Sequence, residues 1–294
     1  MGSRVPPSHR KYGIVGAAAQ SASSARPASG RLDRMRILFV GDVFGKPGRD
    51  ALLRWLPGFC EERAVDFVVA NGENAAGGNG LTSALMEEFL ALGIDVVTTG
   101  NHVWDNKEIY SFVDDEFRLV RPVNFPPYCP GQGYHIYTGG INKKIAVINA
   151  MGRIFLPPLD CPFRTVEQVI EEVKELSDII IIDFHAEATS EKLAMGYYLD
   201  GKVTAVLGTH THIQTADERI LPGGTAYITD LGMTGPQESI LGMDKDMVIN
   251  KIIYQRPVRL EVAGGTAILQ GVMLRIDDSN NQVQEIIRIN STLP

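Results

Sequence analysis

The chain has 294 residues, of which 44% are hydrophobic and 21% are charged, as is usual for a folded globular protein. Its formal net charge of -7 argues against a partner such as polymeric nucleic acid, because proteins that bind it carry an excess of basic residues. No apolar stretch approaches the roughly 20 residues that a membrane-spanning helix needs, so we expect no membrane association.

Residues 1–34 are rich in Ala, Ser, Pro, Gly and Arg, show no sustained periodicity, and contain no acidic residue before Asp33. This composition predicts a disordered leader outside the folded domain. An expression tag, an organelle transit peptide and a start codon assigned too early are all compatible with it. We therefore expect one catalytic domain over residues 35–294, opening with the buried strand that follows Met35.

From Met35 onward, short β-branched runs alternate with amphipathic helical stretches, which is typical of an α/β protein. The predicted strands are 37–40, 67–70, 96–99, 145–149, 179–184 and 203–207. The predicted helices are 49–64, 83–92, 107–112, 166–176 and 191–199. After residue 217 the runs 226–229, 258–262, 266–276 and 284–289 predict antiparallel strands that close a second sheet, with few helices among them.

The three cysteines, Cys60, Cys129 and Cys161, are odd in number and far apart in the sequence. They have neither the spacing of a zinc site nor the density of a disulfide framework. We interpret them as buried thiols of a protein in a reducing compartment, which favours the cytoplasm unless the leader is a genuine transit peptide.

Polar side chains that can bind metals come directly after five of the apolar runs. In α/β folds this is the edge of the sheet where ligands bind. The candidate metal ligands are Asp42, Glu73, Asn74, Asn101, His185, His210 and His212. A single Asp or Asn after a strand is more often a helix cap or a turn residue, so the argument depends on five loops that agree.

The histidines are concentrated in the same loops, since four of the six in the chain lie there. The spacing of His210 and His212 predicts an extended segment with both imidazoles on one side and Thr211 on the other. Imidazole, carboxylate and amide oxygen without thiolate favour Mn, Fe or Zn. Glu73 can bridge two ions, and a pair of ions that holds a hydroxide between them suits phosphate-ester hydrolysis.

The motifs Gly41-Asp42, Gly100-Asn101-His102 and Gly208-Thr209-His210-Thr211-His212 resemble the calcineurin-like metallophosphoesterase signature. Two departures narrow the resemblance: Phe44 stands where that superfamily usually has a histidine, and Glu73 replaces the usual Asp. With Met35 to Asp42 and Asp183 to Glu187, the chain resembles a bacterial subfamily of 2′,3′-cyclic-nucleotide 2′-phosphodiesterases from about Met35 to the C-terminus.

The resemblance implies a sandwich of two mixed sheets flanked by helices, and a pair of iron or manganese ions. It implies hydrolysis of 2′,3′-cyclic nucleotides at the 2′ bond to 3′-nucleotides. By position, Asp42, Glu73 and His212 hold one ion. The other ion is assigned to Glu73, Asn74, Asn101, His185 and His210.

The resemblance also makes His102 the general acid that protonates the leaving oxygen, a role that suits an imidazole that titrates near neutral pH. A residue that merely orients Asn101 is the structural alternative.

The sequence is also compatible with other functions. A phosphomonoesterase or phosphoprotein phosphatase would use the same site, and a regulatory protein could bind a nucleotide with little turnover. The plainest alternative is an α/β scaffold whose strand-end residues only cap turns. A homo-oligomer is a further expectation for an acidic enzyme of this kind.

Overall fold

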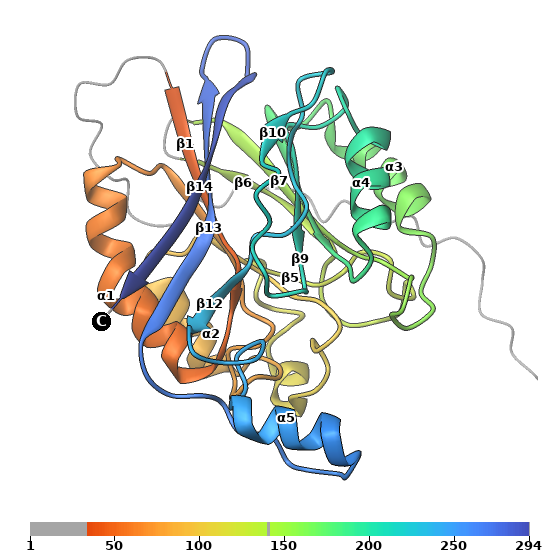
Figure 1. The fold of residues 1–294 in the computed structure, drawn as a ribbon. Coiled ribbons are helices and arrows are strands. Elements are labelled where there is room, and N and C mark those ends of the chain that lie inside the picture. Colours follow the sequence, from red (N-terminus) through yellow and green to blue (C-terminus); the bar gives the residue numbers. More distant parts are fainter. Residues whose placement is uncertain (1–33, 140–141, 294) are drawn as a thin grey trace, which may run out of the picture.

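The computed structural model describes residues 34–139 and 142–293. The predicted leader therefore lies outside the described residues, except for Arg34, the first residue of strand β1. Two sheets lie face to face, with helices on both outer sides (Figure 1). This arrangement confirms the predicted α/β sandwich of two mixed sheets flanked by helices.

The first sheet is eight-stranded, in the order β2-β12-β13-β1-β3-β4-β5, with β14 paired to β13. Strands β1, β3, β4 and β5 are parallel, whereas β13 runs antiparallel to β1 and to β14. Its strands are β1 (Arg34–Val40), β2 (Asp42–Val43), β3 (Phe67–Asn71), β4 (Val96–Thr98), β5 (Leu119–Val120), β12 (Met233–Pro236), β13 (Ala267–Asp277) and β14 (Val283–Leu293).

The second sheet is six-stranded, in the order β10-β11-β9-β8-β7-β6. Strands β7, β8, β9 and β11 are parallel, and β6 and β10 pair antiparallel at the two edges. Its strands are β6 (Tyr134–Thr138), β7 (Lys144–Met151), β8 (Ile179–His185), β9 (Ala205–Thr209), β10 (Arg219–Ile220) and β11 (Ala226–Ile228).

The helices cover the outer faces of the sheets: α1 and α2 pack on the first sheet, α3 and α4 on the second. They are α1 (Gly45–Glu62), α2 (Ser83–Ala91), α3 (Pro162–Val173), α4 (Thr189–Tyr198) and α5 (Lys245–Tyr254), with a short 3-10 helix at Lys107–Ser111. None of the described helices is both long and apolar enough to cross a membrane.

The central strands are apolar at successive positions because both of their faces are buried. In β1, Ile37 and Phe39 point to the second sheet, whereas Leu38 and Val40 pack under α1. Strand β8 repeats the pattern on the other side, where Ile181 faces the first sheet and Ile182 faces α3. The polar residues that follow these runs are therefore carried by rigid, fully packed strands.

The C-terminal region differs from the sequence prediction in its sheet assignment. Strands β13 and β14 extend the first sheet next to β1, and β11 joins the second sheet parallel to β9. The predicted strand 258–262 is irregular, and only Val262 forms an isolated bridge, to Met243.

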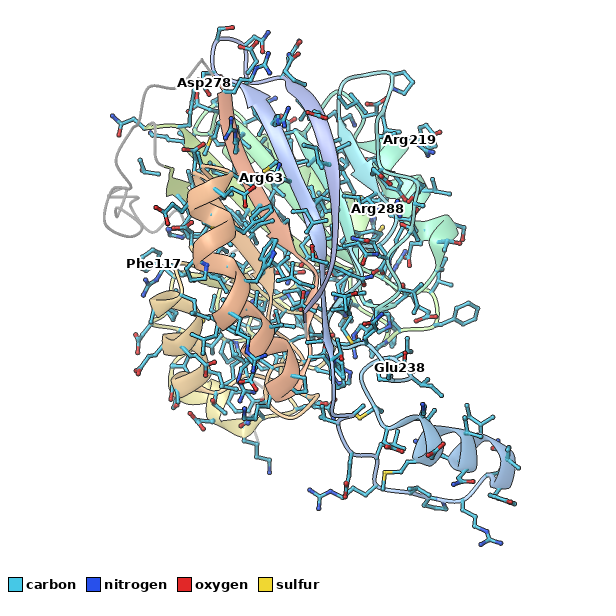
Figure 2. All side chains as sticks on the ribbon, turned by 60° about the vertical axis from the view of Figure 1, so that its left-hand side comes forward. Arg63, Phe117, Arg219, Glu238, Asp278 and Arg288 are labelled. Atoms are coloured by element: carbon cyan, nitrogen blue, oxygen red, sulfur yellow. The ribbon has the colours of Figure 1, made fainter. Side chains whose placement is uncertain are left out.

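Helix α5 was not predicted. Its N-cap is Asp244, whose carboxylate accepts hydrogen bonds from the backbone of Asp246 and Met247. No residue of α5 is buried, and its apolar residues Ile249, Ile252 and Ile253, which recur at helical spacing, are exposed. It stands away from the two sheets in Figures 1 and 2.

Candidate metal centre

The seven predicted ligands gather where the carboxyl ends of the parallel strands meet. The first sheet brings Asp42 after β1, Glu73 and Asn74 after β3, and Asn101 after β4. The second sheet supplies His185 at the end of β8, and His210 and His212 after β9. Side chains from both sheets thus face one another across the sandwich.

The Nε2 atom of His185 is the point where four of these side chains converge. It lies 2.9 Å from Oδ1 of Asn101, 3.0 Å from Nδ1 of His210, and 3.0 Å from Oε1 of Glu73. One imidazole nitrogen cannot hydrogen bond well to three partners at once, but one cation can be bound by all four groups. Within the described residues, Glu73, His185 and His210 form a cluster with metal-binding spacing.

Asp42 and His212 lie beside this cluster. Oδ1 of Asp42 is 4.0 Å from Nδ1 of His185 and 4.0 Å from Nε2 of His212. His212 directs its Nδ1 to the carbonyl of Leu241, at 3.2 Å, which leaves Nε2 on the side of Asp42. Asp42 and Glu73 are both buried, at 0% and 1% exposure, so two carboxylates are removed from water within one small region.

Three buried oxygens test whether cations fit the site. Oδ1 of Asp42 and Oδ1 of Asn74 lack a hydrogen-bond donor among the described residues, and Oε1 of Glu73 has only the shared Nε2 of His185, at 3.0 Å. The amide of Asn74 is already oriented, because its Nδ2 donates to the carbonyl of Gly78 at 2.8 Å. Buried acceptors without donors are costly unless a cation satisfies them, and this donor set suits hard and borderline transition metals.

Two carboxylates orient the histidines from behind. Nδ1 of His185 lies 2.9 Å from Oγ1 of Thr209, whose hydroxyl donates to Asp183 at 2.6 Å. Nε2 of His210 lies 3.0 Å from the carboxylate of Glu187. These contacts fix which ring nitrogen faces the cluster: Nε2 in His185 and Nδ1 in His210.

Asp183 and Glu187 were not among the predicted site residues. A signal for Asp183 existed, since it is a charged residue inside the apolar run of β8, two positions before His185 and therefore on the same face. For Glu187 no comparable signal exists, because exposed glutamates are common in loops.

Burial and mutual charge shift the pKa values of the cluster strongly. Burial raises the pKa of Asp42 well above its usual range, and His185 offsets this only in part. Burial acts the same way on Glu73, but the positive charge of His185 outweighs it and lowers the pKa of Glu73 to about 2. For His185, burial lowers the pKa, yet Glu73 and Asp42 outweigh this and raise it to about 9.

His210 behaves oppositely: burial, together with the charge of His185, lowers its pKa to about 3. The cluster therefore holds one protonated imidazole between carboxylates, and a neutral one beside it. A bound cation would take the place of the proton on His185, as expected when metal binding and protonation compete for the same ligands.

The expected extended geometry of residues 210–212 was wrong. Strand β9 ends at Thr209, and both His210 (φ 101°) and His212 (φ 63°) adopt left-handed backbone conformations. The chain turns sharply here because it must bring both rings back toward Asp42, whose carboxylate accepts a hydrogen bond from the backbone N–H of His210 at 3.2 Å. Thr211 does point away from the cluster, toward Asp230.

Gly100 lets the third loop pass directly against the cluster. A Cβ atom at this position would lie 2.3 Å from Nε2 of His185 and 2.5 Å from a carboxylate oxygen of Glu73. No side chain fits in that space, so the glycine before Asn101 is required by the close approach of backbone to ligands.

His102 sits at the edge of the cluster and is about one-third exposed. Its backbone N–H donates to Glu73 at 3.0 Å, and its Nδ1 lies 2.7 Å from the carboxylate of Asp105. The imidazole is therefore held by a carboxylate on one side, and its Nε2 faces away from Asp105.

Phe44 lies two residues after Asp42 and next to His212. Its ring is buried and meets the ring of His212 edge-on, with centroids 5.4 Å apart. Cβ atoms at Gly78 and Gly242 would collide with the Phe44 ring, which shows how closely these loops enclose it.

Two further features of the sequence have local structural roles. The segment Gly77 to Gly80 forms a turn closed by the hydrogen bond from Gly80 N–H to the carbonyl of Glu73. Trp104 stacks on Tyr110, with centroids 5.4 Å apart, and meets Phe125 edge-on.

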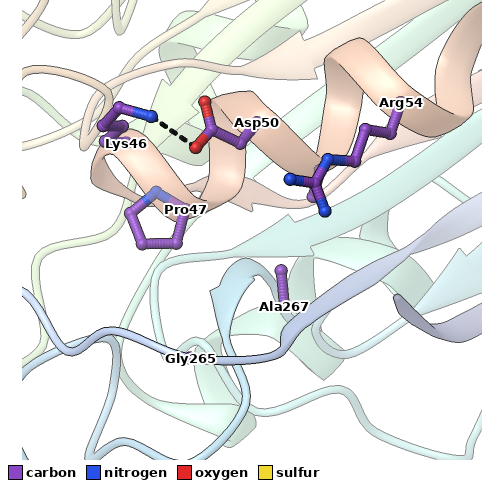
Figure 3. Close-up of a pocket in the computed structure, with 7 residues that line it drawn as sticks. Lys46, Pro47, Asp50, Arg54, Gly265 and Ala267 are labelled. Atoms are coloured by element: carbon purple, nitrogen blue, oxygen red, sulfur yellow. Dashed lines mark hydrogen bonds and ion pairs between the residues drawn. The ribbon is translucent and has the colours of Figure 1, made fainter. Parts of the chain in front are cut away.

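A separate pocket of about 200 Å³ lies beside the N-terminal half of α1 (Figure 3). It contains the ion pair between Lys46 and Asp50, at 2.5 Å, and borders the loop at Gly265. No candidate metal ligand lines this pocket.

The chain is similar to known proteins over most of its length. It is 52% identical over 255 residues to a 2′,3′-cyclic-nucleotide 2′-phosphodiesterase of Bacillus subtilis, covering 87% of this chain and 96% of that protein. It is 35% identical to a putative phosphatase/phosphodiesterase of Mycoplasma genitalium, covering 89% of this chain and 95% of the relative. These relatives confirm the expectation of a phosphoesterase.

Solved structures agree with this relationship. A hypothetical protein from Thermus thermophilus superposes with a TM-score of 0.84 at 41% identity, covering 88% of this chain and all of that one. A phosphatase from Mycoplasma pneumoniae gives a TM-score of 0.84 at 34% identity, covering 90% and 95% of the two chains. Residues 38–289 match the family model described as YmdB-like protein, and the chain therefore belongs to the YmdB-like family.

Proposed function

We propose that this protein hydrolyses 2′,3′-cyclic nucleotides at the 2′ bond and releases 3′-nucleotides. The proposal is supported by the Bacillus subtilis relative, a 2′,3′-cyclic-nucleotide 2′-phosphodiesterase that is 52% identical to this chain over 255 residues. The single observation that carries it is the convergence of Asn101, Glu73 and His210 on Nε2 of His185, beside buried oxygens of Asp42 and Asn74 that have no donor among the described residues.

In this proposal the cluster would hold two transition-metal ions, Fe or Mn, with Zn as a third option. Asp42, Glu73 and His212 would hold one ion, and Glu73, Asn74, Asn101, His185 and His210 would hold the other. When bound, such ions supply an activated water as nucleophile and neutralise charge on the phosphate. The mixed imidazole, carboxylate and amide donors favour these metals.

His102 is the proposed general acid. The carboxylate of Asp105 holds Nδ1 and orients the ring, so Nε2 is the nitrogen that gives a proton to the departing ribose oxygen. Such proton donation is typically worth 10²–10⁴ in rate. The backbone of His102 is tied to Glu73, which keeps the imidazole at a constant position relative to the cluster.

The test is turnover of 2′,3′-cyclic AMP by protein loaded with Mn or Fe, with the products separated by chromatography. We expect 3′-AMP and no 2′-AMP. Absence of hydrolysis of any 2′,3′-cyclic nucleotide with Mn, Fe or Zn would overturn the proposal.

A phosphomonoesterase or phosphoprotein phosphatase is the second candidate, favoured by the phosphatase names of the Mycoplasma relatives. The same site would serve it, so the metal ligands do not separate the two. Comparing cyclic nucleotides with aryl phosphates and a phosphopeptide does. A regulatory nucleotide-binding protein would instead keep its binding and its biological effect when His102 is replaced by Ala.

The proposal also covers the partner, the location and the oligomeric state of the protein. The partner is a small nucleotide rather than polymeric nucleic acid, in keeping with the net charge of -7. A cytoplasmic homo-oligomer without membrane attachment completes it, and size-exclusion chromatography with light scattering tests the oligomeric state.

A further inference from the structure

Lys192 and Asp230 form a buried ion pair outside the set of metal ligands. Nζ of Lys192 lies 2.5 Å from Oδ2 of Asp230, and the two side chains are 1% and 0% exposed. Lys192 belongs to the first turn of α4, and Asp230 follows β11 by two residues. Buried ion pairs add little net stability compared with apolar side chains of the same size, so this pair invites a functional explanation.

Asp230 also accepts hydrogen bonds from Thr211, the residue between two proposed metal ligands. Its Oδ2 accepts from the backbone N–H of Thr211 at 3.0 Å and from the Thr211 hydroxyl at 2.7 Å. Oδ1 accepts from the backbone N–H of Gly232 at 2.8 Å. Thr211 is the residue between His210 and His212, so Asp230 holds the middle of the loop by hydrogen bonds from the side opposite the cluster.

That loop needs an external restraint. His210 and His212 both adopt left-handed conformations, which are strained in residues other than glycine and persist only where surrounding contacts enforce them. On the cluster side, the restraint is the hydrogen bond from His210 N–H to Asp42. On the far side it is the double hydrogen bond of Thr211 to Asp230, whose charge Lys192 compensates.

We propose that Asp230, held by Lys192, is a positioning residue that sets both His210 and His212 for metal binding. The inference rests on the proposed two-metal function, in which the two histidines serve different ions. A single carboxylate outside the metal ligands then controls the affinity for both ions at once.

The competing explanation is that the pair only fastens α4 to the second sheet. If the pair only fastens the helix, its removal lowers the stability of the metal-free fold and leaves metal affinity unchanged. If it positions the histidines, its removal lowers metal affinity, and the loss of an outer partner of this kind typically costs 10- to 100-fold in affinity.

The experiment compares Thr211→Val with Thr211→Ser, and Asp230→Asn with Asp200→Asn. Thr211→Val keeps the shape of the side chain but removes the hydroxyl that donates to Asp230, whereas Thr211→Ser retains it. Asp200 is the matched control, since it also accepts backbone hydrogen bonds, from Gly223 and Thr225, but none from the residues of the metal cluster. Metal-free protein is titrated with Mn²⁺ in a calorimeter without substrate, and its thermal unfolding is recorded separately.

We expect Thr211→Val and Asp230→Asn to weaken Mn²⁺ binding by about tenfold or more at both sites, and Thr211→Ser and Asp200→Asn to bind within about twofold of wild type. Wild-type Mn²⁺ affinity in Thr211→Val would overturn the positioning role, and this variant keeps the test decisive if Asp230→Asn does not fold. Because binding is measured without substrate, a wild-type protein that binds two Mn²⁺ but hydrolyses no cyclic nucleotide would refute the proposed function alone.

Discussion

Nδ1 of His102 lies 2.7 Å from Oδ2 of Asp105, three residues further along the same loop. A carboxylate at this distance fixes the orientation of the imidazole. In the proposed mechanism this oriented ring is the proton donor.

Replacing His102 by Ala should lower kcat for 2′,3′-cyclic AMP by about 10²–10⁴, because the leaving oxygen then departs without a proton donor. Asp105→Asn should give a smaller loss, since the imidazole remains but is less well oriented. Metal analysis of both variants is the control and should match wild type. A His102→Ala variant with full turnover would exclude the general-acid role.

Gly100→Ala should reduce metal binding, because the added methyl group would enter the space of His185 and Glu73. Bound Mn after dialysis, measured by mass spectrometry, reports the effect directly. Gly58→Ala is the control: it lies in α1, and no atom lies within 4 Å of the added carbon. That change should leave metal content intact and stabilise the helix by up to about 1 kcal/mol. Equal metal content in the two variants would contradict this interpretation of the Gly100 contact.

In the metal-free protein, His185 and His210 should make opposite contributions to the pH dependence of stability. The pKa of His185 is raised to about 9, so its contribution is complete below about pH 6.5 and is lost as the pH rises through 9. The pKa of His210 is lowered to about 3, so the unfolded chain gains a proton that the folded chain lacks, and stability falls as the pH drops from about 6.5 toward 3.

Urea unfolding of chelator-treated protein across this pH range provides the measurement. His210→Gln should flatten the acidic side of the profile, and His185→Gln should flatten the alkaline side. A wild-type profile without a maximum would show that other groups dominate the pH dependence.

Phe44→Ala should destabilise the protein by about 3–5 kcal/mol, because it empties a fully enclosed site beside His212. Phe155→Ala serves as the comparison, since that side chain is 87% exposed and its loss should change the free energy of unfolding by less than about 0.5 kcal/mol. Denaturant midpoints of the two variants decide the matter, and similar midpoints would contradict the assignment of Phe44 to the core.

The sequence predicted the fold class and the convergence of the ligands because both follow from one physical rule. Parallel strands buried on both faces appear as continuous apolar runs, and their carboxyl ends meet at one edge of each sheet. Polar residues directly after Val40 and Thr99 therefore had to lie near that edge, whatever the details of packing.

Features that depend on backbone turns and on distant partners were not predictable. The left-handed conformations of His210 and His212 arise from contacts with Asp42 and Asp230, and these residues are far from the segment in sequence or separated from it by β11. Asp230 itself looks like an ordinary residue after a strand. Its partner Lys192 is buried, as is Glu191 beside it in α4, although charged residues in an amphipathic helix are normally expected at the surface. Helix α5 is a different case, because Ile249, Ile252 and Ile253 recur at helical spacing and the sequence therefore carried a signal for a helix that was not used.

The division of the ligands between two sheets has a mechanical consequence. Asn101 follows β4 of the first sheet and His185 ends β8 of the second, so any ion bound between them would link the two sheets. Sliding of the sheets past each other would then require the ions to dissociate. Each ion held at a free concentration 100 times its dissociation constant adds about 2.7 kcal/mol against unfolding. Chelation should thus loosen the whole sandwich, with faster amide exchange in β4 and β8 as its signature.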